Sequence, residues 1–290
     1  MIYNLGSINL DLVYGLDTLP QAGETCASNH FEKFLGGKGI NQSVAAHAAG
    51  ANVRHIGAVG PDGDWVRERI RQFGLKMDGI KPVQAATGHA IVAVDKNGEN
   101  QIILHGGSNQ AIPFEWITEQ ALDIRSDDFA LCQNETNLTR DFAKLAQERG
   151  ARVVLSAAPF DAKQVQDLRD FVYLLAVNEG EAAALADASG QAPVNMGFPL
   201  LLVTKGSKGA SVYVDGAEIF QPAFEIAPVD TTGAGDTFLG SFVGRLDQEY
   251  DLPGALRYAA AASALQVTQM GAASAIPSKD TVYAFMKENT

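Results

Sequence analysis

Residues 152–186 read RVVLSAAPFDAKQVQDLRDFVYLLAVNEGEAAALA, with two short apolar runs at 152–155 and 173–177. Each run is followed by a segment whose apolar residues recur at helical spacing, at 162–171 and 179–186. A short, continuously apolar run is typical of a strand buried on both faces. Strands that alternate with helices predict right-handed crossovers and a mostly parallel sheet covered by helices on both sides.

The same alternation extends along most of the chain. Further apolar runs predict strands at 2–5, 53–59, 129–133 and 200–204. Helical spacing predicts helices at 40–49, 64–73, 138–149, 234–246, 253–270 and 278–288. We therefore expect an α/β protein, a three-layer α/β/α sandwich that forms a single domain over residues 1–290.

Two stretches interrupt this alternation. Residues 12–35 alternate polar and apolar side chains, and residues 88–105 form a predicted hairpin around the Asn97-Gly98 turn. Their four strands do not fit the strand–helix rhythm of the main sheet. We expect them to form a small second sheet that lies above the main one.

The composition limits the possible partners. The chain has 290 residues, of which 46% are hydrophobic, and it is long enough to bury a core without disulfides. Its net charge of −12 argues against a nucleic acid or an anionic membrane surface as partner, but leaves room for a local site for a small anion. Cys26 and Cys132 lie far apart, and the five histidines form no metal-binding pattern, so neither a disulfide framework nor a zinc site is expected.

The N-terminal residues MIYNLGSINLDL lack the basic and apolar regions of a secretory signal. No apolar run in the sequence approaches the ~18 residues that a membrane-spanning helix needs. We therefore expect a cytoplasmic protein without a membrane partner.

The strongest local signal for chemistry is DTTGAGDTF at residues 230–238. A glycine-rich turn that opens a helix directs unpaired backbone N–H groups and the positive end of the helix dipole outward, which suits a phosphate. Asp236 lies inside the first turn, where its carboxylate could accept a proton from a hydroxyl group. The same residues also fit an ordinary helix start with an acidic residue in its first turn.

A second glycine-rich segment, GGKGIN at residues 36–41, allows the backbone to approach a ligand closely and offers Lys38 and Asn41 as donors. It lacks the GxxxxGK[ST] pattern of a P-loop, and no strand–helix unit of a dinucleotide-binding fold encloses it. A flexible loop that Asn41 caps is the alternative interpretation.

Three further polar groupings carry weaker signals. Asn9 and Asp11, two positions apart on an extended segment, point to the same face and suit a sugar diol, although a polar strand end explains them equally. Asn178 and Glu181 follow an apolar run, where an amide and a carboxylate can hold a metal–phosphate unit or cap a helix. The TKGSKG sequence at residues 204–209 follows another predicted strand and also fits a plain turn.

Together these motifs resemble the ribokinase-like (PfkB) carbohydrate kinase family. GGKGIN matches the N-terminal GGKGxN signature of that family, and DTTGAGD matches its C-terminal DTxGAGD signature. Shorter family motifs occur in the same order, as NLD at 9–11, PQAGET at 20–25, NEGE at 178–181 and TKGSKG at 204–209. The resemblance covers nearly the whole chain and implies the fold of that family, with the small sheet as a lid.

The resemblance implies transfer of the γ-phosphoryl group of ATP to a sugar hydroxyl, with the 5-hydroxyl of D-ribose as the leading acceptor. Asp236 would be the base, and the N–H groups of Gly233, Ala234, Gly235 and Asp236 would form the anion hole. A kinase for another sugar or a nucleoside is the nearest alternative, and a catalytically silent binding protein on the same fold is the second. An α/β dehydrogenase is disfavoured because the dinucleotide fingerprint is missing.

The resemblance also implies the ligands of both substrates. The sugar would be held by Asn9, Asp11, Gly37, Lys38, Asn41 and Glu135. The nucleotide would be held by Asn178, Thr204, Lys205, Gly206, Ser207, Lys208, Gly209 and Gly235. Glu181 would support Mg²⁺ through water.

Finally, the resemblance implies a potassium ion beside the anion hole and a second subunit. The potassium ligands would be Asp230 and the backbone carbonyls of Thr232, Gln266, Gln269 and Gly271. Ala275 stands where the family carries a serine ligand, so we expect a weakened or altered cation site. The lid is expected to pair two copies of the chain into a homodimer.

Overall fold

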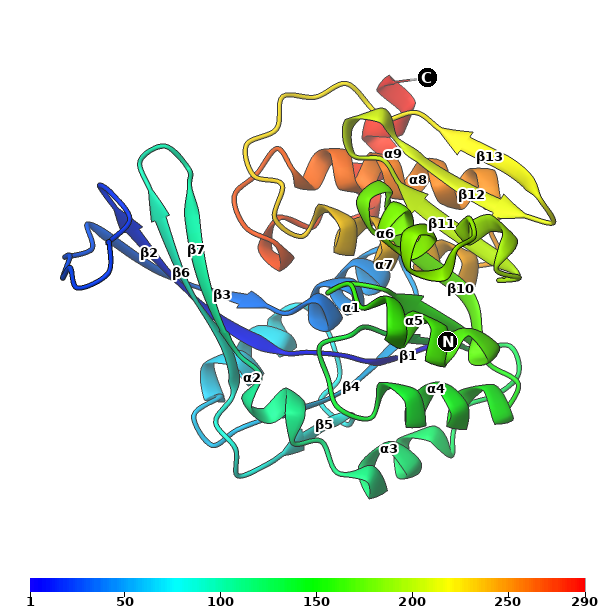
Figure 1. Cartoon of the computed structure of the whole chain (residues 1–290), viewed down its shortest axis with the longest axis horizontal. Helices are drawn as coiled ribbons and strands as arrows, with labels where there is room; N and C mark the ends of the chain where they lie inside the picture. Colours follow the sequence, from blue (N-terminus) through cyan, green and yellow to red (C-terminus); the bar gives the residue numbers. More distant parts are fainter. Residues whose placement is uncertain (290) are drawn as a thin grey trace.

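The computed structural model describes residues 1–289 and contains one large and one small β-sheet (Figure 1). From edge to edge, the strands of the large sheet are β13 (Ala217–Gln221), β12 (Ala210–Val214), β11 (Leu200–Thr204), β10 (Val172–Asn178), β9 (Arg152–Ser156), β8 (Phe129–Cys132), β1 (Ile2–Leu5), β4 (Val53–Val59) and β5 (Ile80–Pro82). Every pairing from β11 to β5 is parallel, whereas β12 and β13 add an antiparallel hairpin at one edge. The predicted mostly parallel sheet is therefore confirmed.

Helices cover both faces of this sheet. One face packs against α1 (Lys38–Ala48), α2 (Asp64–Gln72), α7 (Ala234–Asp247) and α8 (Leu252–Gln266). The other face packs against α3 (Phe114–Ala121), α4 (Thr139–Glu148), α5 (Ala162–Leu168) and α6 (Glu179–Ser189). The last helix, α9 (Lys279–Glu288), packs on the outside of α8. This is the predicted three-layer α/β/α sandwich.

The central strands explain why the layers form. In β9, Val154 points into the core on the α7 side, while Val153 and Leu155 point into the core on the α4 side, and all three are fully buried. Successive side chains of a strand alternate between faces, so a continuously apolar strand needs cover on both sides.

Two elements were not predicted, and helices α5 and α8 end before their predicted bounds at residues 171 and 270. Helix α3 begins after Pro113 and is short, and β5 has only three residues, so neither has a strong periodic pattern. Helix α8 ends at Gln266 rather than at residue 270 because the chain turns away to form a loop beside α7. Within residues 1–289, we find no helix with both the length and the apolar character that crossing a membrane requires.

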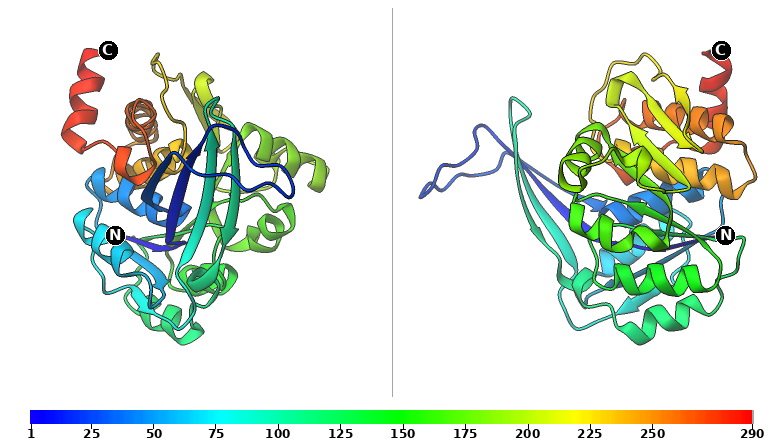
Figure 2. Two further views of the ribbon diagram at one scale, coloured as in Figure 1. Left: turned by 90° about the vertical axis from the view of Figure 1, so that its left-hand side faces the viewer. Right: turned by 45° about the vertical axis from the view of Figure 1, so that its right-hand side comes forward.

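The small sheet has the order β3 (His30–Gly36), β2 (Asn9–Leu16), β6 (Gly88–Asp95) and β7 (Asn100–His105). It projects away from the main body, as Figure 2 shows, and its four strands are those predicted from 12–35 and 88–105. Its first strand begins earlier than predicted, at Asn9 rather than at residue 12. Asn9 and Asp11 therefore lie within the lid sheet itself, and β2 follows β1 after only three residues.

Helices α1 and α7 approach each other closely because glycines face the contact. A Cβ atom built on Gly240 of α7 would lie 2.3 Å from the backbone oxygen of Gln42, and one built on Gly244 would lie 2.9 Å from that of Ala46. Backbone atoms cannot yield as a side chain can. The glycines therefore set the distance between the two helices whose first turns carry the GGKGIN and DTTGAGD motifs.

We expect Gly240→Ala to lower the free energy of unfolding by about 1–3 kcal/mol, because the added methyl group forces α1 and α7 apart. Chemical denaturation monitored by circular dichroism measures this loss. Gly235→Ala is the matched control on the same helix, since a Cβ atom at Gly235 meets nothing within 4 Å. Equal stability of the two variants would contradict this account of the helix contact.

Candidate active site

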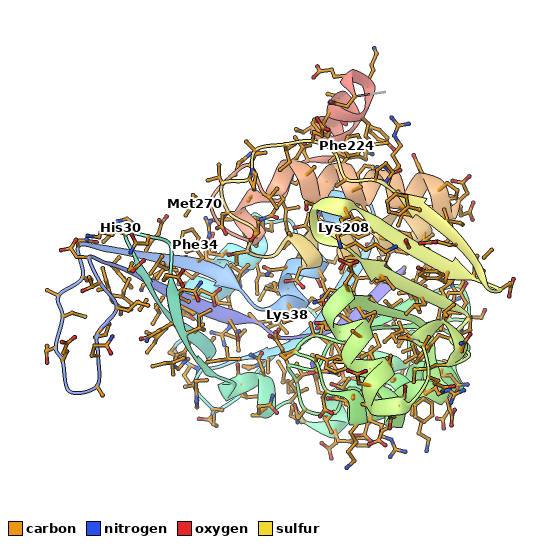
Figure 3. The ribbon with its side chains drawn as sticks, turned by 45° about the horizontal axis from the view of Figure 1, so that its top comes forward. His30, Phe34, Lys38, Lys208, Phe224 and Met270 are labelled. Carbon is orange, nitrogen blue, oxygen red and sulfur yellow. The ribbon has the colours of Figure 1, made fainter. Side chains whose placement is uncertain are left out.

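A cavity of about 230 Å³ lies at the carboxyl ends of β9, β10 and β11, beside the first turn of α7. Crevices at the carboxyl ends of parallel strands are the usual ligand sites of α/β sheets. Figure 3 shows Lys38 where the small sheet joins the main body, and Lys38 lines the same cavity. Other residues that line it are Ser156, Asn178, Glu181, Thr204, Gly233, Ala234, Gly235 and Asp236.

The first turn of α7 offers backbone donors to this cavity. Gly233 precedes the helix with φ 77°, a left-handed conformation that favours glycine. The N–H of Ala234 donates to the carbonyl of Thr231 at 3.2 Å, so one group of the predicted anion hole is already bonded. The N–H groups of Gly235 and Asp236 lie in the first turn, where the helix itself supplies no acceptor. An anion can therefore bind there.

Asp236 is held between the two helix starts. Its Oδ1 accepts a hydrogen bond from Nε2 of Gln42 at 2.8 Å, and its Oδ2 accepts one from Nδ2 of Asn41 at 3.2 Å. Burial raises the pKa of the Asp236 carboxyl above its usual value, although the charge of Lys38 and the two amides oppose that rise. A carboxylate whose pKa is raised toward neutrality is a better proton acceptor.

A chain of buried amides lies behind Asp236. Gln133, at the end of β8, donates through Nε2 to Oε1 of Gln42 at 2.8 Å and to Oδ1 of Asn4 at 2.9 Å. Asn4 in turn donates to Oγ of Ser43 and to the carbonyl of Gly39, both at 2.8 Å. Sequence analysis did not identify these positioning residues, and the available signal was a polar residue inside an apolar strand, as Asn4 is in IYNL.

Glu135, which the resemblance assigns to the sugar, lies beside the start of α1. Its Oε2 accepts hydrogen bonds from the hydroxyl of Ser7 and, at 3.0 Å, from the backbone N–H of Lys38. The chain around Ser7 touches the start of α1, because a Cβ atom on Gly39 would lie 2.3 Å from Cα of Gly6. These contacts fix the carboxylate beside the GGKGIN turn.

The structure places Asn9 and Asp11 on one face of β2, as predicted. Asn9 is buried, and its Oδ1 accepts a hydrogen bond from Nδ2 of Asn109 at 2.7 Å. Asp11 lies against Gly36, whose missing side chain makes room for the carboxylate. Burial, together with the charge of Glu135, raises the pKa of Asp11 to about 6.

The residues predicted to hold the nucleotide divide into two groups. Asn178 and Glu181 form a capping box at the start of α6, so the capping interpretation of the NEGE motif is confirmed. Both residues also line the cavity, and their role toward a metal–phosphate unit stays a prediction. Thr204 lines the cavity as well. Lys205, in contrast, donates to Ser211 and Glu218, and Lys208 pairs with Glu179 at 3.1 Å. The residues of 205–209 do not line the cavity.

The implied magnesium site fits the residues present. Among residues 1–289, no three His, Cys, Asp or Glu side chains gather closely enough to hold a metal ion by themselves. Magnesium commonly binds through one or two carboxylates together with substrate phosphates and water. Glu181 lines the cavity and supplies a carboxylate of that kind.

The implied potassium site does not fit. The carbonyl oxygens of Thr232 and Gly271 accept hydrogen bonds from the side-chain amide of Gln266, at 2.8 and 3.0 Å. Both carboxylate oxygens of Asp230 accept backbone N–H groups, from Thr232 and Gly271, at 2.9 Å. Ala275 is buried and offers no side-chain oxygen. Three of the expected ligands are thus already bonded within the chain.

A glycine-rich helix start, an adjacent buried carboxylate and a small sheet that projects from the main body are the arrangement expected of a phosphotransferase of the α/β class. The model of the pfkB family carbohydrate kinases matches residues 1–279, and the chain belongs to this family. Its predicted family membership is therefore confirmed.

Named relatives agree with this assignment. A ribokinase of Haemophilus influenzae is 34% identical over an alignment of 298 positions, gaps included. The alignment covers 98% of this chain and 97% of the relative. The crystal structure of a ribokinase from Thermotoga maritima superposes with a TM-score of 0.87 at 30% identity and covers 99% of both chains. An Arabidopsis thaliana ribokinase, solved with ribose and ATP, superposes with a TM-score of 0.86 at 28% identity over 99% of this chain and 98% of that one. The ribokinase-like fold is thereby confirmed.

We expect sugar binding to weaken at acidic pH because of Asp11. Its carboxyl has a raised pKa of about 6, so the charged form, which would accept hydrogen bonds from the sugar hydroxyls, is lost as the pH falls below that value. Between about pH 8 and about pH 5, the sugar dissociation constant should rise about tenfold. Calorimetric titration without nucleotide measures it. Asp11→Asn should bind more weakly and lose this pH dependence, and an unchanged pH profile in that variant would contradict the assignment.

Proposed function

We propose that this protein transfers the γ-phosphoryl group of ATP to the 5-hydroxyl of D-ribose. The observation that carries the proposal is the position of Asp236. Its carboxylate lies in the same helix turn as the N–H groups of Gly235 and Asp236 and borders the cavity at the strand ends. The relatives named ribokinase support ribose as the acceptor.

In the proposed reaction, the sugar hydroxyl attacks the γ-phosphorus while its proton passes to Asp236. The bond from the γ-phosphorus to the bridging oxygen of ADP breaks, and ADP leaves. The free N–H groups of Gly235 and Asp236 bind the oxygens of the transferred group, and the positive end of α7 adds to this stabilisation. Mg²⁺, held through the phosphates and Glu181, would neutralise part of the phosphate charge.

The sugar would lie between the lid and the start of α1. Asn9 and Asp11 of β2 face it from the lid, and Glu135 and Lys38 face it from the main body. Two carboxylates accept hydrogen bonds from neutral hydroxyls but repel a phosphate, so the site favours an unphosphorylated sugar. The adenine side would be lined by Asn178 and Thr204 at the ends of β10 and β11, whereas the contacts of Lys205 favour a structural role for that residue.

Potassium is not part of this proposal, because Gln266 already binds two of the expected carbonyl ligands. A nucleoside kinase and a silent sugar-binding protein are the alternatives to test. A coupled assay of ADP release with D-ribose, 2-deoxyribose, D-fructose and adenosine separates them. The proposal is supported if ribose is the preferred acceptor and phosphorus NMR of the product locates the phosphate on O5. Absence of turnover with every acceptor would refute it.

Asp236→Asn tests the base. We expect kcat to fall about 10²–10⁴-fold, because the amide cannot accept the hydroxyl proton. Sugar affinity should change little, since the assigned sugar ligands remain. Asp280→Asn on the exposed side of α9 makes the same chemical change away from the site and should keep full activity. A near-normal kcat in Asp236→Asn would show that Asp236 is not the base.

We also propose that the lid pairs two copies of the chain. By strand register, Leu12, Ile91 and Ile103 lie side by side on the face of the small sheet opposite to Asp11. Ile103 is 66% exposed and Ile91 38%, and Phe31 lies on the same face. An exposed apolar sheet face needs cover, and a second lid provides a matching surface.

Ile103→Glu should therefore convert a dimer into a monomer in light scattering at micromolar concentration, because it places a charge at the centre of this face. Lys96→Glu adds the same residue at the tip of the β6–β7 hairpin and should leave the dimer intact. A wild-type chain that is monomeric in the same measurement would contradict the pairing.

A further inference from the structure

Two loops far apart in the sequence meet beside the first turn of α7. The segment before that helix is bonded to the segment after α8, since the N–H groups of Val229 and Asp230 donate to the carbonyl of Val267 at 2.7 and 3.1 Å. A third hydrogen bond joins the same two segments, because the Asp230 carboxylate accepts the N–H of Gly271. The position of the anion-binding turn therefore depends on how these two loops are held together.

The side chain of Gln266 completes this junction. It is fully buried at the last residue of α8, and its Nε2 donates to the carbonyl of Thr232 in one loop and to that of Gly271 in the other. Its Oε1 has no hydrogen-bond partner within the described part of the chain. The side chain thus acts here only as a donor, and it bridges two oxygens that would otherwise face each other unpaired.

We propose that the Gln266 amide takes the place of a monovalent cation, so that this kinase holds its anion-binding turn without potassium. Converging carbonyl oxygens attract positive charge, and either a cation or the two hydrogens of an amide can supply it. The amide supplies it permanently, as part of the chain. The inference rests on the proposed phosphoryl transfer only where kcat is the measurement. The melting temperatures test it independently.

The surroundings favour the amide over an ion. A bound cation needs several oxygen ligands, but Asp230 is committed to two backbone N–H groups and Ala275 has no oxygen in its side chain. The methylene groups of Gln266 also occupy buried volume at the junction.

The roles of Gln266 and potassium can be separated by titration. Wild-type kcat and melting temperature should stay flat when KCl replaces tetramethylammonium chloride at constant ionic strength. In Gln266→Ala the carbonyls of Thr232 and Gly271 lose their donor and space opens between them. We expect kcat to fall about tenfold or more without potassium, the kinetic equivalent of one buried acceptor left unpaired.

Potassium should then restore most of the kcat of Gln266→Ala and raise its melting temperature. Gln266→Met fills the same volume without a donor, so it should lose activity and respond to neither salt. Gln248→Ala, on the exposed end of α7, is the control for a glutamine removed elsewhere.

Several-fold activation of the wild type by potassium would overturn the proposal, and so would an unchanged kcat in Gln266→Ala without the ion. If Gln266→Ala fails to fold, the wild-type salt titration and Gln266→Met still decide the question. If the wild type has no kinase activity, the proposed function fails, while the melting temperatures continue to test the cation replacement.

Discussion

The contact between the first turns of α1 and α7 is the constraint on which the site depends. Gln42 and Asn41 of α1 hold both carboxylate oxygens of Asp236 in α7, and Gly240 lets the two helices come close enough for those bonds to form. The same approach places the GGKGIN turn, which orients Glu135, next to the anion-binding turn. The proposed sugar side and the proposed phosphate side of the site are thus fixed relative to each other by one helix pair.

The sequence predicted the layers well because strands buried on both faces leave an unambiguous pattern, as in residues 152–155. It also separated the lid from the main sheet, since alternating strands around Asn97-Gly98 contrast with that pattern. The early start of β2 was harder to predict. Asn9 and Asp11 look like the polar end of a strand, and the pairing of β2 with β3 and β6 shows that they begin a new sheet.

The site was predictable where backbone conformation demands glycine and was not predictable where distant side chains meet. The DTTGAGD motif predicts its turn because Gly233 adopts a left-handed conformation. The hydrogen bond from Gln133 to Gln42 joins residues 91 positions apart, so no local pattern predicts it. Gln266 is the sharpest case, because its side chain is an ordinary helix residue in the sequence. Its role arises only where the loops at Thr232 and Gly271 converge on it. Lys205 shows the opposite case. It belongs to a recognisable motif, but its ammonium group binds Glu218 instead of lining the cavity.

The charges of the site divide its two ends by function. Asp11 and Glu135 place negative charge where we propose that the sugar hydroxyls bind, and burial, together with the charge of Glu135, raises the pKa of Asp11. Lys38 and the helix start of α7 place positive potential where, in the proposed reaction, the phosphoryl group would pass. Asp236 lies between these regions. Burial raises the pKa of its carboxyl, and the charge of Lys38 opposes that rise. A chain with a net charge of −12 can therefore bind a polyanionic nucleotide, because the attraction is local and built from backbone groups that carry no formal charge.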